Sequence, residues 1–438
     1  MANKQLSLKK LSIPIFCELF LRCLALIINT VMVSHYSNAL VGALGAGNQI
    51  FDLFITIFSF LSVGCSVFVA QALGARNFTL ARKAIHQSLF LNALLGLLCT
   101  LFILWQSELL LRLLKVPQSL GAESKIYLQM LGICLFFEAV DIVISAILRV
   151  YNRAALVMGV ALLMDGLIVL GNYYVLHFTD LELFGVGLVN VFGRIVAIVV
   201  LLAFLILILK IPLKFKEMIA LESGILKKIL NIGGFSAGEN LIWIVQYTIA
   251  FAFVASLGGE NLSVQTLYFQ ISLLIMLIGI ALSLANEIIV GKLVGANYPS
   301  IAYKHTWTAL YLSLIASGVV SGVNFFLQDF TMSAIALEEG LKKLMAPLFA
   351  LSIFLEISRS FNIVMVNALR ASGDARFPFF TGLVFMMGVS LPVGYVLCFH
   401  AGLGILGVWL GFCADEFFRG LVNAWRWKSK KWQGKRLV

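Results

Sequence analysis

Twelve long apolar segments constrain this chain more than any other feature of its sequence. About 20 consecutive apolar residues cross the hydrocarbon core of a bilayer, and a single segment there satisfies its backbone polar groups only as a helix. We therefore expect an all-α membrane protein with twelve transmembrane helices. The segments lie at about 11–35, 40–72, 84–107, 124–148, 154–176, 185–209, 229–257, 264–291, 305–328, 344–369, 378–400 and 405–425.

The composition excludes most other classes of protein. Hydrophobic residues make up 61% of the 438 residues and charged residues 12%, with a mean hydropathy of +1.00. Soluble domains carry about 25% charged residues. The sequence has no Gly-Lys-Ser/Thr phosphate loop, and its seven cysteines have the spacing neither of a disulfide framework nor of a zinc site. We expect no soluble catalytic domain, no direct use of ATP and no bound cofactor.

The first half of the chain resembles the second when the sequence is shifted by 221 positions. VAQALGARNFTLARK (69–83) then falls on VGKLVGANYPSIAYK (290–304), and Leu148-Arg149 falls on Leu369-Arg370. The same shift places Glu18 on Glu239, each inside an apolar segment. Homologous halves with six spans each predict two pseudo-symmetric six-helix bundles around a central cavity. The predicted regions are an N-terminal lobe (1–209), a cytoplasmic linker (210–228), a C-terminal lobe (229–425) and a basic cytoplasmic tail (426–438).

The basic residues orient the chain in the membrane. If both termini are cytoplasmic, 23 of the 32 Lys and Arg residues lie on the cytoplasmic side, 5 lie outside and 4 lie within spans. Because cytoplasmic loops are rich in Lys and Arg, we expect both termini in the cytoplasm and a multi-pass protein of the plasma membrane. The tail WRWKSKKWQGKR directly follows a span, which indicates contact with anionic membrane lipid rather than with nucleic acid.

Ionisable residues within the spans are the strongest functional signal, because a charge that faces lipid is costly. Glu18–Arg22 and Asp415–Arg419 have the i,i+4 spacing of an ion pair on one helix face, and Glu356–Arg359 has the i,i+3 spacing. Such pairs fit a purely structural role as well as a functional one. Ten acids and four arginines lie within spans: Glu18, Asp52, Glu138, Asp141, Asp165, Glu239, Glu287, Glu356, Asp415 and Glu416, with Arg22, Arg194, Arg359 and Arg419.

Two of these acids, Glu239 and Glu287, have no basic residue one helical turn away. A buried carboxylate without a counter-charge favours binding a proton, and with further oxygen ligands it can hold a sodium ion. Asn240 and Gln246 follow Glu239 on the same predicted helix and could complete such a site. A hydrogen-bonded structural carboxyl is the alternative for both acids.

Several segments resemble the multidrug and toxic compound extrusion (MATE) transporters, and in particular a bacterial branch of that family. The resemblance covers essentially the full chain. It implies two bundles that alternate between inward-open and outward-open states and export organic, often cationic compounds across the bacterial inner membrane. It also implies coupling to entry of sodium ions or protons, and a cavity within one chain requires no second copy. The matching segments include IPIFCELFLRCLALIINTVMVSHYSNALVGALGAGNQI, VAQALGARN, FSAGENLIWIVQ, VGKLVGANYPSIAYK, LEISRSFNIVMVNALRASGDARFP and ADEFFRGLVNAWRWKSKKW.

The sequence departs from the family pattern in the N-terminal lobe. The family commonly has an Asp before a Thr in the first helix, where this chain has Asn29-Thr30, and Asn172 stands where the fifth helix often has an Asp. An amide exchanges no proton at physiological pH, so proton coupling through these positions is not expected. Glu18, Asp165 and Asp141 are the candidate substitutes.

In the C-terminal lobe the resemblance implies a coupling carboxylate in the seventh helix and another acid in the tenth. Glu239 and Glu356 occupy those helices, each about one turn from the usual position. We predict coupling through Glu239 first, Glu356 second and Glu287 third, with a sodium ion as one option at Glu239. Secondary polar or substrate-binding roles are predicted for Asn240, Gln246, Asn29, Glu18, Asp165, Asn172 and Asp415.

Two other functions remain open. A flippase for a lipid-linked oligosaccharide shares the wider architecture but favours a cationic cavity for pyrophosphate, whereas acids outnumber arginines in these spans. An integral membrane enzyme needs a metal or nucleophile cluster at the membrane surface, and the sequence has no such pattern. We therefore predict a transporter of small organic cations rather than an enzyme.

Overall fold

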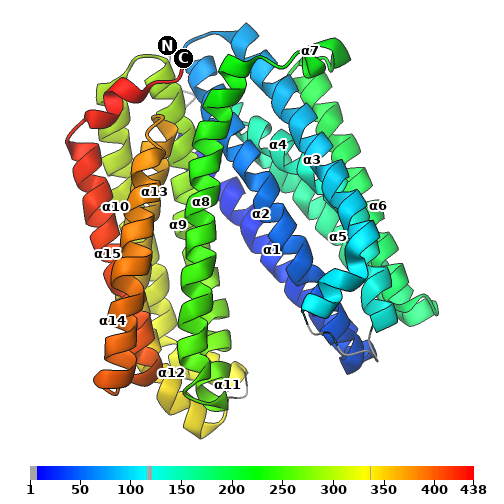
Figure 1. The fold of residues 1–438 in the computed structure, drawn as a ribbon, viewed down its shortest axis with the longest axis vertical. Coiled ribbons are helices and arrows are strands. Elements are labelled where there is room, and N and C mark those ends of the chain that lie inside the picture. Colours follow the sequence, from blue (N-terminus) through cyan, green and yellow to red (C-terminus); the bar gives the residue numbers. More distant parts are fainter. Residues whose placement is uncertain (1–6, 115, 117–120, 336) are drawn as a thin grey trace. The chain divides into compact units, whose positions relative to one another are not determined.

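The computed structural model describes residues 7–114, 116, 121–335 and 337–438, and within them the chain is helical with no strand (Figure 1). The long helices of the first half are α1 (Leu8–Tyr36), α2 (Asn38–Gly74), α3 (Phe78–Leu113), α4 (Gly121–Val150), α5 (Ala154–Phe178) and α6 (Glu182–Ala203). Those of the second half are α8 (Ser223–Ala255), α9 (Gly259–Gly295), α10 (Pro299–Phe326), α12 (Glu339–Ala371), α13 (Arg376–Phe385), α14 (Leu391–Tyr395) and α15 (Gly404–Lys428). The short helices are α7 (Phe215–Ile219) and α11 (Gln328–Ala334).

The twelve predicted membrane helices are confirmed. Eleven spans among the described residues are long and apolar enough to cross a bilayer, and the last three-part span runs continuously from Arg376 to His400 through π-helical turns on either side of α14. The twelfth helix is α15, whose 25 residues include Asp415, Glu416 and Arg419. These charges lower its hydropathy, but they are buried in the protein and do not face lipid.

The described chain divides into two compact units. The N-terminal unit comprises Ile13–Val69 and Asn77–Gly233, and the C-terminal unit comprises Gly234–Val438 with Ala70–Arg76 and the described part of residues 1–12. The divisions in α1 and in α8 follow Ser12 and Gly233, which are related by the same 221-position shift. Each half of the sequence therefore contributes the first turns of its first helix to the unit that the other half builds.

The fourth helix of each repeat lies at the centre of its unit. In the N-terminal unit α4 packs against α3 and α6, and in the C-terminal unit α12 packs against α9, α10 and α15. The most apolar stretch of α4 is 72% buried, whereas that of α6 is only 28% buried and leaves its outer face to lipid. Polar residues of α4 and α12 are therefore held away from the hydrocarbon.

Two glycines bring helices of the C-terminal unit into backbone contact. A Cβ at Gly74 would collide with the carbonyl oxygen of Lys292, and a Cβ at Gly295 would collide with the carbonyl oxygen of Gln71. The 221-position shift turns the first contact into the second. The repeat thus produces a reciprocal crossing in which neither glycine can carry a side chain without moving a helix.

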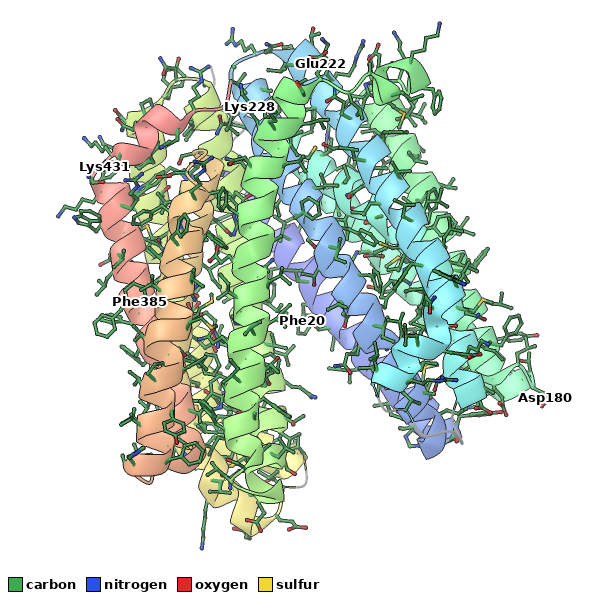
Figure 2. The ribbon with its side chains drawn as sticks, in the orientation of Figure 1. Phe20, Asp180, Glu222, Lys228, Phe385 and Lys431 are labelled. Atoms are coloured by element: carbon green, nitrogen blue, oxygen red, sulfur yellow. The ribbon has the colours of Figure 1, made fainter. Side chains whose placement is uncertain are left out.

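The basic tail folds back onto the C-terminal unit. The Trp427 and Trp432 rings stack with centroids 4.0 Å apart, both are fully buried, and Trp432 Nε1 donates to the Trp427 carbonyl at 2.9 Å. The Leu437 amide donates to Gln71 Oε1 at 2.8 Å, and Gln71 Nε2 donates to the Ala371 carbonyl at 2.7 Å. Gln71 therefore satisfies a carbonyl at the end of α12 that has no partner within the helix. Lys431 remains exposed (Figure 2), and contact of the tail with lipid stays a prediction.

Trp432→Ala should lower the free energy of unfolding by about 3–5 kcal/mol, because it leaves a ring-sized cavity against Trp427. The measurement is thermal unfolding of the purified protein in detergent. Trp425→Ala is the matched control: Trp425 is 58% exposed, so its loss should shift stability by about 0.5 kcal/mol or less. Equal effects of the two substitutions would contradict the packing of the tail.

Candidate functional site

A cavity of about 290 Å³ in the C-terminal unit, here called the C-terminal cavity, brings most of the predicted coupling residues together. Its wall combines aromatic and sulfur-containing side chains with amides, two glutamates and three arginines. It is lined by Glu239, Asn240, Trp243, Phe269, Leu273, Met276, Ile280, Arg359, Asn362, Ile363, Val366, Asn367, Arg370, Met386, Glu416 and Arg419.

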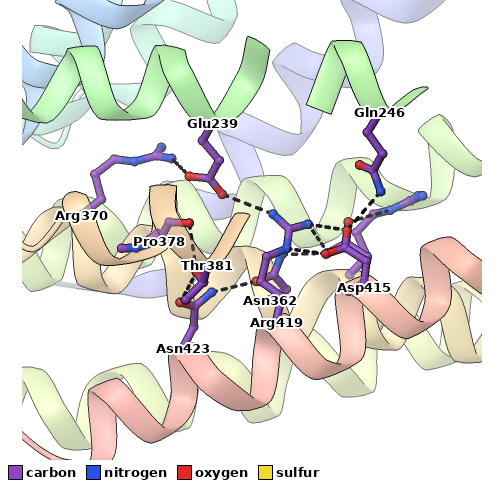
Figure 3. Close-up of polar contacts among 11 residues, drawn as sticks. Glu239, Gln246, Asn362, Arg370, Pro378, Thr381, Asp415, Arg419 and Asn423 are labelled. Carbon is purple, nitrogen blue, oxygen red and sulfur yellow. Dashed lines mark hydrogen bonds and ion pairs between the residues drawn. The ribbon is translucent and has the colours of Figure 1, made fainter. Parts of the chain in front are cut away.

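Glu239 lies between two guanidinium groups that come from other helices (Figure 3). Its Oε2 is 3.4 Å from Arg370 on α12, and its Oε1 is 3.4 Å from Arg419 on α15. The absence of a basic neighbour along α8 therefore did not predict the environment of Glu239. Periodicity along one helix identifies only partners on that helix, and these partners cross between helices.

The same network extends to three further acids. Arg419 contacts Asp415 at 3.1 Å and Glu416 at 3.2 Å. Arg359 contacts Glu356 at 2.7 Å and lies 3.9 Å from Glu416. The predicted pairs Asp415–Arg419 and Glu356–Arg359 are thus confirmed. Four acids and three arginines form one buried network, which carries one formal negative charge when all seven are ionised.

Amides complete this network, and sequence reasoning identified only some of them. Asn240 lines the cavity with Glu239, but Gln246 donates to Asp415 at 3.4 Å and reaches Glu239 only through Arg419. Asn362 donates to Glu416 at 2.8 Å and accepts from Asn423 at 3.1 Å. The sequence offered no charge to mark Asn362 or Asn423.

Glu287 differs from the acids of this network. It lies on α9, is 5% exposed, and its Oε2 has no hydrogen-bond partner among the described residues. It is not among the residues that line the C-terminal cavity. Glu356, the second predicted coupling residue, is also buried and accepts from Ser272 at 2.6 Å behind the cavity wall.

A second cavity, the N-terminal cavity, occupies about 240 Å³ in the N-terminal unit. Asn172 Nδ2 donates to Asn29 Oδ1 at 2.9 Å within its wall, so the two amides predicted at acidic family positions contact each other. Asp165 Oδ2 and Asn172 Oδ1 are buried acceptors without a partner among the described residues. The lining comprises Arg22, Ala25, Leu26, Asn29, Thr30, Leu44, Asn48, Phe51, Asp52, Ile55, Tyr127, Leu131, Glu138, Met164, Asp165, Ile168, Asn172, Val186, Asn190 and Arg194.

The predicted Glu18–Arg22 pair is wrong. Glu18 instead contacts Arg149 at 2.5 Å, and Arg22 contacts Glu138 at 3.5 Å, because both partners on α4 face α1. Asp141, the other candidate on α4, accepts from Ser145 at 3.0 Å. Glu18 does not line the N-terminal cavity but lies in a closed ion pair of its own.

The repeat relates the ion pairs of the two units. The 221-position shift carries Glu18–Arg149 onto Glu239–Arg370, so one glutamate–arginine pair joins the first and fourth long helices of each repeat. Arg149 and Arg370 were counted with the cytoplasmic loops, but they lie in the last turns of α4 and α12. The matched positions in the aligned repeats were the signal that could have identified both pairs.

One pair of repeat-related positions carries opposite charges in the two units. Glu138 on α4 contacts Arg194 on α6 at 3.3 Å. The shift carries these positions onto Arg359 and Asp415, so acid and base are exchanged between the helices. The N-terminal cavity is therefore lined by three acids and two arginines, and the C-terminal cavity by two acids and three arginines.

Comparison with known proteins gives a consistent family match. The family model described as MatE matches twice, at residues 14–174 and 236–396. The chain is 31% identical to the "Uncharacterized transporter YisQ" of Bacillus subtilis (98% of this chain, 96% of that protein). It is 24% identical to the "Probable multidrug resistance protein NorM" of Thermotoga maritima (97% of this chain, 92% of that protein). A crystal structure of MATE in the bent conformation matches with a TM-score of 0.89 at 18% identity (98% and 96% of the two chains), which establishes likeness of fold.

Arg149→Met should lower the free energy of unfolding by about 3–5 kcal/mol, because it leaves the Glu18 carboxylate buried without its partner. The double variant Glu18→Met/Arg149→Met should recover most of that loss. Chemical or thermal unfolding of the four proteins in detergent measures the coupling. Arg112→Met is the control, since this side chain is 81% exposed. Additive effects of the two Met substitutions would contradict the pair.

Proposed function

Because the chain belongs to the MatE family of membrane transporters, we propose that it is a secondary active efflux transporter that exports organic compounds by antiport with protons or sodium ions. We propose the plasma membrane, with both termini cytoplasmic, as its location, and a single chain as the functional unit. The substrates are small, lipophilic organic cations. The observation that carries the proposal is the buried network around Glu239, whose four acids exceed its three arginines by one charge.

That excess gives the network a reason to bind one monovalent cation. A buried uncompensated charge is unfavourable, and a proton, a sodium ion or a cationic substrate removes it. Only one of these ligands is needed for neutrality, so they compete for the same charge. Such competition is the basis of antiport, because binding of the inorganic cation weakens the hold on the substrate.

Glu239 is the carboxylate at which we place this exchange. It lines the C-terminal cavity beside Asn240, and its two arginine contacts of 3.4 Å are longer than the 2.7 Å contact of Glu356 with Arg359. A proton or sodium ion at Glu239 loosens these two contacts, which join α8 to α12 and α15. The ligand thereby favours one arrangement of the helices over another, as coupling requires.

The rest of the cavity wall suits a lipophilic cation. Trp243 and Phe269 lie 6.4 Å apart between ring centroids and provide faces for cation–π contact, and Met276 and Met386 provide polarisable surface. One charge that moves through a potential of 100 mV gains about 2.3 kcal/mol, enough to drive export against a gradient of roughly fiftyfold.

The N-terminal cavity has a different part in this proposal. Asn29 and Asn172 carry no exchangeable proton, so Asp165, with its unpartnered buried Oδ2, is the acid there that we expect to attract a cation. Glu287 is the third coupling candidate in the C-terminal unit, because its Oε2 is buried without a hydrogen-bond partner among the described residues.

Glu239→Gln should reduce ion-driven efflux at least tenfold, because the amide can carry neither the proton nor the charge that binds sodium. The measurement is ethidium transport in proteoliposomes under an imposed sodium or proton gradient, one at a time. Glu339→Gln is the control, since that side chain is 82% exposed and contacts Lys342 on its own helix.

Several outcomes would change the assignment. Undiminished efflux by Glu239→Gln would contradict the role of Glu239, and loss in Glu287→Gln alone would move the exchange to α9. Complete loss in Asn29→Ala, with Glu239 intact, would move it to the N-terminal unit. Thermal unfolding of each variant separates a failure of transport from a failure to fold.

A further inference from the structure

The segment that joins the two repeats is held against α3 by a buried histidine. His86 is fully buried, its Nε2 lies 2.9 Å from the carbonyl oxygen of Pro212, and its Nδ1 lies 3.2 Å from Glu217 Oε2. Gln87, the next residue on α3, donates to the carbonyl of Ala220 at 2.9 Å. The segment 210–222, here called the linker, thus docks on the first turns of α3 with α7 at its centre.

The chemistry of these contacts fixes where the histidine carries hydrogen. A proline carbonyl can only accept, so His86 Nε2 must donate and must bear a hydrogen. In a neutral ring Nδ1 then has only a lone pair, which faces the carboxylate of Glu217. The Nδ1 contact has the distance of an ion pair but is not aligned as a hydrogen bond, so its sign depends on charge. It is repulsive for the neutral ring and attractive for the imidazolium.

The other charged groups around His86 keep Glu217 ionised. Arg82 contacts Glu217 at 2.8 Å and Lys214 contacts it at 3.3 Å. Burial raises the pKa of Glu217, but the hydrogen bond from Lys214 and the charges of Arg82, Lys214 and His86 outweigh it and hold that pKa below its usual range. The carboxylate therefore stays charged at neutral pH, and the group that titrates there is the histidine.

The remaining charges near this contact have their own partners or point elsewhere. Lys83 contacts Glu222 at 2.5 Å at the end of the linker. Lys216, on α7, is exposed. Arg149, at the end of α4, which packs against α3, is held by Glu18. Titration of His86 is thus the change of charge within the contact between pH 6 and pH 8.

We propose that His86 is a proton-binding site that makes docking of the linker on α3 depend on pH. The docked linker stabilises the imidazolium through Glu217, so docking takes up a proton. Docking is then favoured as the pH falls through the ordinary range of histidine, near 6.5, and is weakened as the pH rises above it. One proton changes the docking equilibrium by at most about tenfold per pH unit.

Hydrogen exchange of the full-length protein in detergent tests this proposal. The reporters are the amides of Glu217, Met218 and Ala220, which donate within α7 and its end. After correction for the intrinsic rate at each pH, these amides should exchange five- to a hundredfold more slowly at pH 6 than at pH 8. Amides of α4 serve as the internal reference for global opening.

The variants separate charge from simple packing. His86→Gln can donate to Pro212 but cannot titrate, so protection should become independent of pH. Glu217→Gln should have the same effect, because it removes the charge that the imidazolium attracts. Gln87→Ala should weaken docking at both pH values and keep the pH dependence. His177→Gln, at an exposed histidine of α5, should leave the profile unchanged.

Equal protection of wild-type α7 at pH 6 and pH 8 would overturn the proposal, and so would a full pH dependence in His86→Gln. If His86→Gln does not fold, the Glu217→Gln profile decides alone, since that substitution lies on the linker. The readout needs no transport, so its outcome is independent of the proposed export function.

Discussion

The structure depends on carboxylates that are buried in apolar helices and must find guanidinium groups on other helices. No water is present at that depth to solvate an isolated charge, so each acid either pairs, takes a proton or is excluded. Glu18 and Glu239 meet this constraint through Arg149 and Arg370, and Glu138 meets it through Arg22 and Arg194. Because the partners lie on different helices, the same contacts that neutralise the acids also fix how α1, α4 and α6, or α8, α12 and α15, are packed.

Duplication explains what the two units share, and later substitution explains how they differ. The glutamate–arginine pair and the glycine crossing persist at repeat-related positions. Around that shared frame the charges were redistributed. Glu138 and Arg194 correspond to Arg359 and Asp415, and the Asn29–Asn172 contact has no charged counterpart in its own unit. A packing frame can stay constant while the polar wall of each cavity changes, because the cavity side chains carry little of the helix–helix contact.

The sequence was sufficient for the class, the number of membrane helices and the family, because these follow from apolar length and from long matching segments. It also predicted the pairs Asp415–Arg419 and Glu356–Arg359, whose partners share a helix. It failed for Glu18–Arg22 and for the arginines around Glu239, because helix periodicity carries no information about which neighbouring helix a side chain faces. The amides Asn362 and Asn423 were missed for a related reason: in isolation nothing distinguishes a buried network amide from one that caps a turn.

The contacts of Gln71 have a consequence for the order in which the protein can be completed. This side chain, in the first half of the sequence, bonds to Ala371 and to Leu437, which are 300 and 366 positions later. During synthesis the segment 70–76 is therefore made long before the surface it packs on exists, and its contacts close only when almost the last residue has left the ribosome. The C-terminal unit is thus not a module of the second half alone. A fragment that begins at Gly234 would lack residues that belong to its own core, and separately expressed halves would have to exchange segments to become whole.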